Sequence, residues 1–82
     1  MKNVRNLKEL DEVIAEANTV NWNRLKGFYN RARYRGAYNL IDHMDTIISL
    51  NKALKRQELE LSRECIIELL ELYLPEELEA ES

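Results

Sequence analysis

Few side chains in this sequence are of the types that carry out catalysis or hold metal ions. The single histidine, His43, is flanked by Asp42 and Asp45. Positions i, i+1 and i+3 do not share one helix face, so these three side chains form a poor metal site. We expect His43 to lie on the surface at the edge of an apolar stripe, and we expect no metal and no cofactor.

The single cysteine is the only strong nucleophile, and its spacing is that of a core residue. Cys65 lies four residues after Leu61 and four before Leu69. A free thiol in such a stripe behaves as a small hydrophobe and is unreactive when buried. Ser49 and Ser62 lack the glycines of a nucleophile elbow, and there is no phosphate-binding glycine loop. The sequence therefore predicts no catalytic residues and no enzymatic activity.

Charge is sorted along the chain. Residues 21–36 hold five basic side chains and no acid, whereas residues 58–82 hold nine glutamates against the single basic residue Arg63. The net charge of −3 therefore hides a dipolar distribution. At helical spacing the charges fall into two stripes. The basic stripe is Arg24, Arg31 and Arg35 with Phe28 beside them, and the acidic stripe is Glu60, Glu64, Glu68 and Glu71.

Each stripe covers about 16 Å of helix, so the two could lie alongside each other within a monomer or across a dimer. Exposed ion pairs add only about 0–1 kcal/mol each, but they orient partners. The acidic stripe has a plainer explanation as a solvated face. From this pattern we predict a small non-enzymatic regulatory or adaptor protein that acts through protein–protein binding, an inhibitor or modulator of a larger cellular machine. Both stripes are its predicted partner-binding residues.

Two other functions stay open. The basic segment 22–38 interleaves arginines with aromatic residues, which is chemistry that binds phosphates and stacks on bases. An isoelectric point near 5.2 disfavours this nucleic-acid-associated regulator. Alternatively, the Glu60–Glu71 face could mimic nucleic acid and occupy a basic cleft of some enzyme.

Helices must position these stripes. Glycine and proline are scarce, and apolar residues recur at three- and four-residue steps, so we expect an all-α fold. The spacing predicts two short N-terminal helices, at residues 4–17 with Asn3 as N-cap and at residues 22–35. Pro75 ends the helical pattern before an acidic C-terminal tail. We expect residues 1–78 to form a single small helical domain and residues 79–82 to be a frayed acidic end.

Residues 37–74 contain no breaker and carry a broad apolar stripe. A continuous helix of this length would measure about 57 Å, longer than a globule of this size is wide. The segment either breaks near residues 51–57 and folds back as a hairpin, or stays straight and pairs with a second copy. We favour the long helix and a homodimer, because no usual turn residue is present. Asn51 either sets register in the seam or marks a kink facing water.

The remaining composition suits a cytoplasmic protein. A single cysteine cannot form an internal disulfide, which fits a reducing compartment. The first ten residues hold no apolar run of the kind found in secretory signals, and no stretch approaches the roughly 18 apolar residues of a membrane span. We expect no membrane partner.

Overall fold

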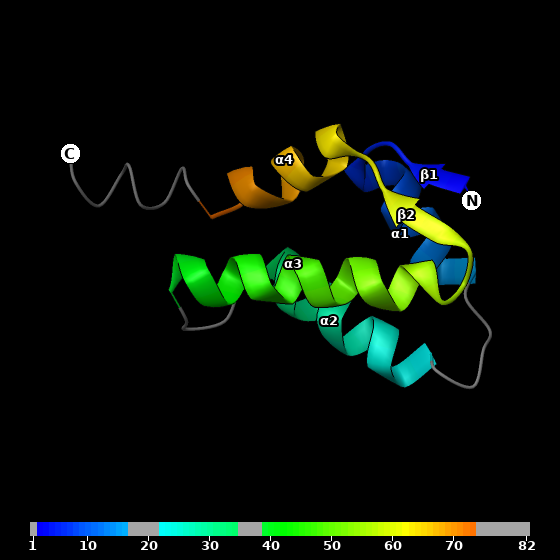
Figure 1. The fold of residues 1–82 in the computed structure, drawn as a ribbon, viewed down its shortest axis with the longest axis horizontal. Coiled ribbons are helices and arrows are strands. Elements are labelled where there is room, and N and C mark those ends of the chain that lie inside the picture. Colours follow the sequence, from blue (N-terminus) through cyan, green and yellow to red (C-terminus); the bar gives the residue numbers. More distant parts are fainter. Residues whose placement is uncertain (1, 17–21, 35–38, 74–82) are drawn as a thin grey trace.

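A computed structural model describes residues 2–16, 22–34 and 39–73, and for Trp22 the backbone only. The predictions for Ala17, Arg35, Pro75 and the acidic tail lie outside these residues. The described part of the chain is mostly helical, as predicted, and adds one pair of short strands (Figure 1). In chain order the elements are β1 (Lys2–Val4), α1 (Leu7–Glu16), α2 (Trp22–Tyr34), α3 (Leu40–Lys55), β2 (Leu59–Leu61) and α4 (Arg63–Glu71).

The first helix begins later than predicted. Asn6, not Asn3, caps it: the Asn6 side-chain oxygen accepts from the Glu9 backbone N–H at 2.9 Å, and the Asn6 carbonyl accepts from Leu10 N–H. Val4, predicted as the first helical residue, instead ends β1 and is buried. Leu10 and Ile14 are buried, in agreement with the apolar spacing. Val4 is buried as well, so the sequence pattern alone does not distinguish it from a residue of the helix.

The prediction of one long helix is wrong, and the hairpin alternative is right. α3 ends at Lys55, and the chain turns through residues 56–58 before β2 and α4 run back along it (Figure 1). Glu58 makes the turn by adopting a positive φ of 61°, with its N–H bonded to the Lys55 carbonyl. Glycine is the usual residue in this left-handed conformation. The turn therefore carries no breaker that the sequence pattern could reveal.

Asn51 does not mark a helix end that faces water. Helix α3 continues through it to Lys55, and its side-chain oxygen accepts from the Leu61 N–H at 2.9 Å. It is half-buried between α3 and the returning chain. Asn51 thus holds β2 against α3 within one chain.

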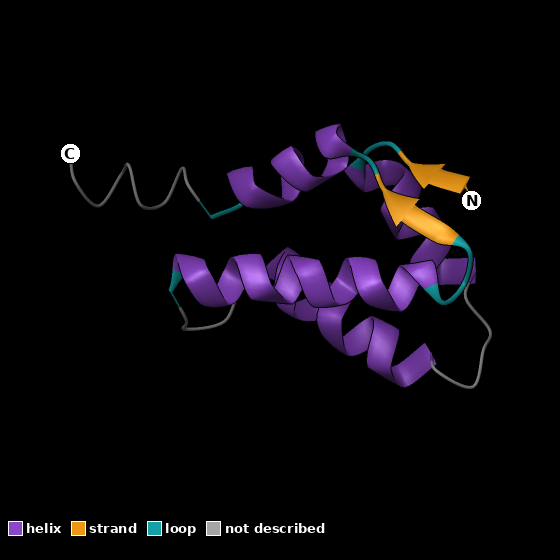
Figure 2. Cartoon of the chain, in the orientation of Figure 1, coloured by secondary structure: helices purple, strands orange, loops and turns teal. Residues whose placement is uncertain are grey.

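Strands β1 and β2 pair in parallel, with Lys2 opposite Leu59 and Val4 opposite Leu61 (Figure 2). This pairing was not predicted and changes the fold from all-α to mainly α. Three-residue strands are too short to show an alternating pattern, and neither contains a run of β-branched residues.

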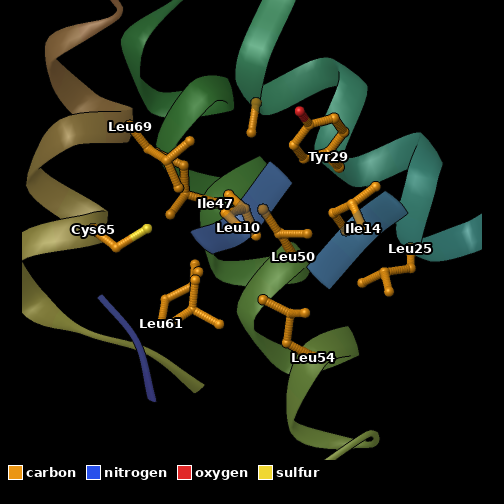
Figure 3. Packing of buried hydrophobic residues seen from close by; sticks show 12 residues of the cluster. Leu10, Ile14, Leu25, Tyr29, Ile47, Leu50, Leu54, Leu61, Cys65 and Leu69 are labelled. Carbon is orange, nitrogen blue, oxygen red and sulfur yellow. The ribbon is translucent and has the colours of Figure 1, made fainter. Parts of the chain in front are cut away.

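The core lies where α1, α2, α4 and β2 meet the inner side of α3. Leu10 and Ile14 from α1 and Leu25 and Tyr29 from α2 are buried, as their spacing predicted, and they surround Leu50 at the centre (Figure 3). The stripe of the long segment is also covered from within the chain, by residues that include Leu54, Leu61 and Leu69. The argument that this stripe needs a second copy to cover it is therefore wrong. No helix in the described ranges is long and apolar enough to cross a membrane.

Replacing Glu58 by glycine should stabilise the protein. The left-handed conformation costs roughly 1 kcal/mol for a residue with a Cβ atom, and glycine is free of that cost. Part of the gain is offset by the greater freedom of glycine in the unfolded chain. We expect Glu58→Gly to raise the free energy of unfolding by about 0.5–1 kcal/mol in urea denaturation.

Gln57→Gly is the matched control, because Gln57 is in the same turn and only Glu58 among the described non-glycine residues has a positive φ. This control should be neutral or destabilising. Equal effects of the two variants would show that the left-handed turn does not limit stability.

Candidate binding surfaces

A shallow groove between α2 and α3 gathers three cations around one aromatic ring. Arg24 and Phe28 come from the first half of α2, and Lys52 and Arg56 come from the end of α3, with Ser49 and Ala53 between them. The two helices meet this way because the start of α2 lies beside the end of α3 (Figure 1). We call these six residues the basic groove.

The positive charge of the basic groove is not balanced from within. None of its six lining residues is acidic, and among the residues that the structure describes no carboxylate pairs with Arg24, Lys52 or Arg56. Lys52 and Arg56 also lie in or next to the last turn of α3, where cations are favoured by the helix dipole. The three charged ends are exposed, whereas Phe28 is half-buried against the core. The groove can therefore hold carboxylate or phosphate groups beside an apolar contact.

Sequence spacing named two of the six residues of this groove. Arg24 and Phe28 were predicted, Arg31 is exposed but does not line the groove, and Arg35 lies outside the described residues. Lys52 and Arg56 were missed. They repeat the i, i+4 spacing of Arg24 and Phe28, and they become neighbours of those residues only once α2 and α3 pack as a hairpin.

The predicted acidic stripe does not exist as one surface. Glu60 lies on β2 rather than on a helix, and its carboxylate is 3.8 Å from the Lys55 ammonium. Glu68 points into the fold, whereas Glu64 and Glu71 are exposed on α4. The stripe assumed one continuous helix, and the turn before β2 removes its first member. The contacts of Glu60 and Glu68 are made with Lys55 and α1, not with the predicted arginines.

Glu68 has a structural task at the start of α1. Its carboxylate accepts from the Leu7 backbone N–H at 2.8 Å, which is one of the N–H groups that a helix leaves without an internal partner. A negative charge is also favoured at this end of a helix. Ser62 adds a second link, since its hydroxyl caps α4 by accepting from Cys65 N–H and donates to the Arg5 carbonyl at 3.3 Å. These contacts tie α4 to the first turn of α1.

A second polar link joins α1 to α2. The Tyr29 hydroxyl donates a hydrogen bond to the Asp11 carboxylate, and the Arg33 guanidinium lies 3.5 Å from the same carboxylate. Burial and the bond to Asp11 raise the pKa of Tyr29. Arg33 therefore belongs to the packing of α1 against α2, not to the basic groove.

The prediction that His43 is a surface residue is wrong. It is fully buried between α3 and α4, where its Nε2–H donates to the Leu69 carbonyl at 2.9 Å. Its ring also stacks on Tyr73, with centroids 5.5 Å apart. The pattern placed His43 at the edge of the apolar stripe, and α4 folds back over that edge. Within the described ranges no cluster of three or more His, Cys, Asp or Glu side chains could hold a metal ion.

Cys65 is a buried core residue, as predicted. Its sulfur points into the cluster beside Leu61 and Leu69 (Figure 3). Burial raises the pKa of the Cys65 thiol to about 11, with a smaller contribution from the nearby Glu68 and Glu9 carboxylates. A thiol in this state is protonated at neutral pH and is a poor nucleophile.

A second groove, of about 200 Å³, runs between the outer sides of α3 and α4. We call it the apolar groove; it is lined by Met44, Ile47, Ile48, Asn51, Lys52, Lys55, Ile66 and Leu70. Of its lining residues, Met44 and Ile48 stay 44% and 52% exposed, and Ile41 and Ile67 of the same two helices are exposed as well. Exposed apolar surface gathered in this way is typical of sites of protein association.

Comparison with known proteins finds no family model, no curated protein and no solved structure that matches the chain. The function has to be argued from these two surfaces.

Loss of the Glu68 carboxylate should destabilise the protein. Glu68→Ala leaves the Leu7 N–H without its acceptor in a half-buried position and removes a charge from the helix N-terminus. We expect the free energy of unfolding to fall by about 1–2 kcal/mol, and by less in Glu68→Gln, whose amide oxygen can still accept. Glu71→Ala, at an exposed position in the last turn of α4, should change it by less than about 0.5 kcal/mol. Equal losses at positions 71 and 68 would contradict the capping role.

The raised pKa of Cys65 makes stability depend on pH in the alkaline range. The folded state holds the thiol proton more tightly than the unfolded state, so this contribution is complete below pH 8.5 and is lost as pH rises through about 11. Between about pH 9 and 11 the wild type should lose about 2–3 kcal/mol more than Cys65→Ala, which has no thiol to titrate. Urea denaturation across this range measures the difference. Parallel pH profiles would show that Cys65 is not the titrating group.

Proposed function

We propose that the chain is a small non-enzymatic regulatory or adaptor protein that binds an acidic segment of a partner protein in its basic groove. One observation carries the proposal: Arg24, Lys52 and Arg56 converge around Phe28, and no acidic side chain among the residues that the structure describes lines the groove. Through this contact the protein would inhibit or modulate a larger cellular machine. We place it in the cytoplasm, because a single unpaired thiol suits a reducing compartment.

The size and shape of the basic groove favour a side-chain ligand over a small molecule. Its volume is about 170 Å³, below the roughly 300 Å³ at which pockets begin to enclose drug-sized ligands. Two arginines offer the planar fork that binds a carboxylate through two parallel hydrogen bonds. Phe28 provides an apolar contact between the cations. One or two acidic side chains next to an aliphatic one match this arrangement.

The charge around the basic groove favours a protein segment over a nucleic-acid backbone. A backbone needs a continuous track of cations, but the first half of α3 carries Asp42 and Asp45 on exposed positions. The whole chain is acidic, with a net charge of −3. The nucleic-acid alternative keeps one supporting observation, an aromatic ring among cations. The acidic-mimic alternative has less support, because Glu60 and Glu68 are engaged within the fold.

Fluorescence anisotropy with two labelled probes tests the proposal: a glutamate-rich peptide with interspersed leucines, and a single-stranded oligonucleotide of equal charge. We expect the peptide to bind more tightly than the oligonucleotide at low salt. The double variant Arg24→Glu with Arg56→Glu should weaken peptide binding at least about tenfold, because each reversal replaces attraction with repulsion.

The control is the double variant Lys2→Glu with Lys8→Glu, which makes the same change in net charge at two exposed cations outside the groove. It should weaken peptide binding less than about threefold. Equal losses of affinity in both double variants would show that binding depends only on net charge, and would overturn the proposal. Tighter binding of the oligonucleotide than of the peptide would support the nucleic-acid alternative instead.

A further inference from the structure

The apolar groove between α3 and α4 has charges of opposite sign at its two ends. Helices α3 and α4 are antiparallel, since His43 at the start of α3 reaches Leu69 at the end of α4, whereas Asn51 reaches Leu61 just before α4. The end nearer the β2 turn therefore carries the lining residues Lys52 and Lys55, and the exposed Arg63 begins α4 at the same end.

The opposite end carries exposed carboxylates. Asp45 lies on α3 two turns before Lys52, and Glu71 lies on α4 two turns after Arg63. At 100° per residue Asp45 and Lys52 fall within about 20° of one another, and Arg63 and Glu71 within about 80°. The exposed side of each helix thus runs from a cation at one end to an anion at the other.

Exposed isoleucines lie midway between these charges. Ile48 is placed between Asp45 and Lys52, and Ile67 is placed between Arg63 and Glu71. Both keep about half of their surface uncovered. The face therefore has an apolar centre with a positive and a negative end.

Such a face is complementary to itself. A two-fold axis that crosses both helices near Ile48 and Ile67 places Asp45 of one copy opposite Lys52 of the other, and Arg63 opposite Glu71. Interfaces related by a two-fold axis require this kind of self-complementary patch. The apolar centre then meets its own copy, and each of these four charges meets the opposite sign. Lys55, which also lines the groove, lies 3.8 Å from the Glu60 carboxylate of its own chain.

We propose that the α3–α4 face is the interface of a homodimer, in which a second copy of the chain covers the apolar groove. This interface differs from the straight-helix dimer of the sequence prediction, because it uses the outer side of the helices and leaves the buried stripe inside each monomer. The inference does not rest on the proposed function: Arg24, Phe28 and Arg56 take no part in it, and Lys52 is the residue that the two surfaces share.

Analytical ultracentrifugation from about 5 to about 500 µM tests the dimer, a range that covers micromolar dissociation constants. The wild type should shift from monomer to dimer with concentration. Ile48→Asp should stay monomeric throughout, with an unchanged circular dichroism spectrum, since it alters an exposed side chain. A wild type that is monomeric at every concentration would overturn the proposal and leave the face to a different protein.

A charge exchange on α4 tests the two-fold arrangement. Arg63→Glu and Glu71→Arg should each weaken the dimer about tenfold, because each places like charges opposite one another. The double variant restores opposite signs and should return the dissociation constant to within about threefold of the wild type. Weakening in both single variants without recovery in the double variant would overturn this geometry. Lys52 is left unchanged, because it lines both grooves.

Discussion

The parallel pairing of β1 with β2 is the constraint that places α1 and α4 relative to each other and so decides which side of α3 they cover. Two backbone hydrogen bonds extend it at either side, from Lys2 N–H to the Glu58 carbonyl and from Ser62 N–H to the Val4 carbonyl. They bring the start of the chain to the segment that leads into α4. Glu68 can then cap α1, and α1 and α4 close over the inner side of α3. The outer side of α3 stays open, and both grooves flank it.

The predictable part of the fold is the part set by local spacing. The cores of α1 and α2 follow from apolar residues three and four positions apart, and so does the buried position of Cys65. The failures involve interactions that spacing does not encode. Glu58 takes a conformation usually held by glycine, and the strands are recognised only by their hydrogen-bonded partners. His43 was misplaced for the same reason, since its burial depends on a helix that returns from beyond the turn.

The residues of the candidate binding surfaces show the same difference between what local spacing encodes and what tertiary contacts bring together. Arg24 and Phe28 share a helix face, so spacing alone brings them together. Lys52 and Arg56 join them through the packing of α3 on α2, which is a tertiary contact between separate segments. The predicted acidic stripe failed for a different reason. Its helical spacing assumed one continuous helix, but the chain turns at residues 56–58 before β2. The broad apolar stripe predicted for residues 37–74 also contains Ile41 and Ile48, which are exposed, because the side of α3 that is covered depends on where α1 and α4 lie.

The short strand pair also means that parts of the molecule differ in their stability against local unfolding. A pair of three-residue strands has little stability of its own, so β1 and α1 are held mainly by side-chain contacts to α4 and the core. Proteins open in cooperative units, and a unit at the start of a chain can detach while the rest stays folded. We therefore expect a partially unfolded state in which β1 and α1 have detached while α2 and α3 remain packed together. The basic groove is lined by residues of α2 and α3 and by Arg56 directly after α3, so its binding chemistry does not require β1 and α1 to be packed in place. During synthesis, the same groove can form before β2 is available to pair with β1.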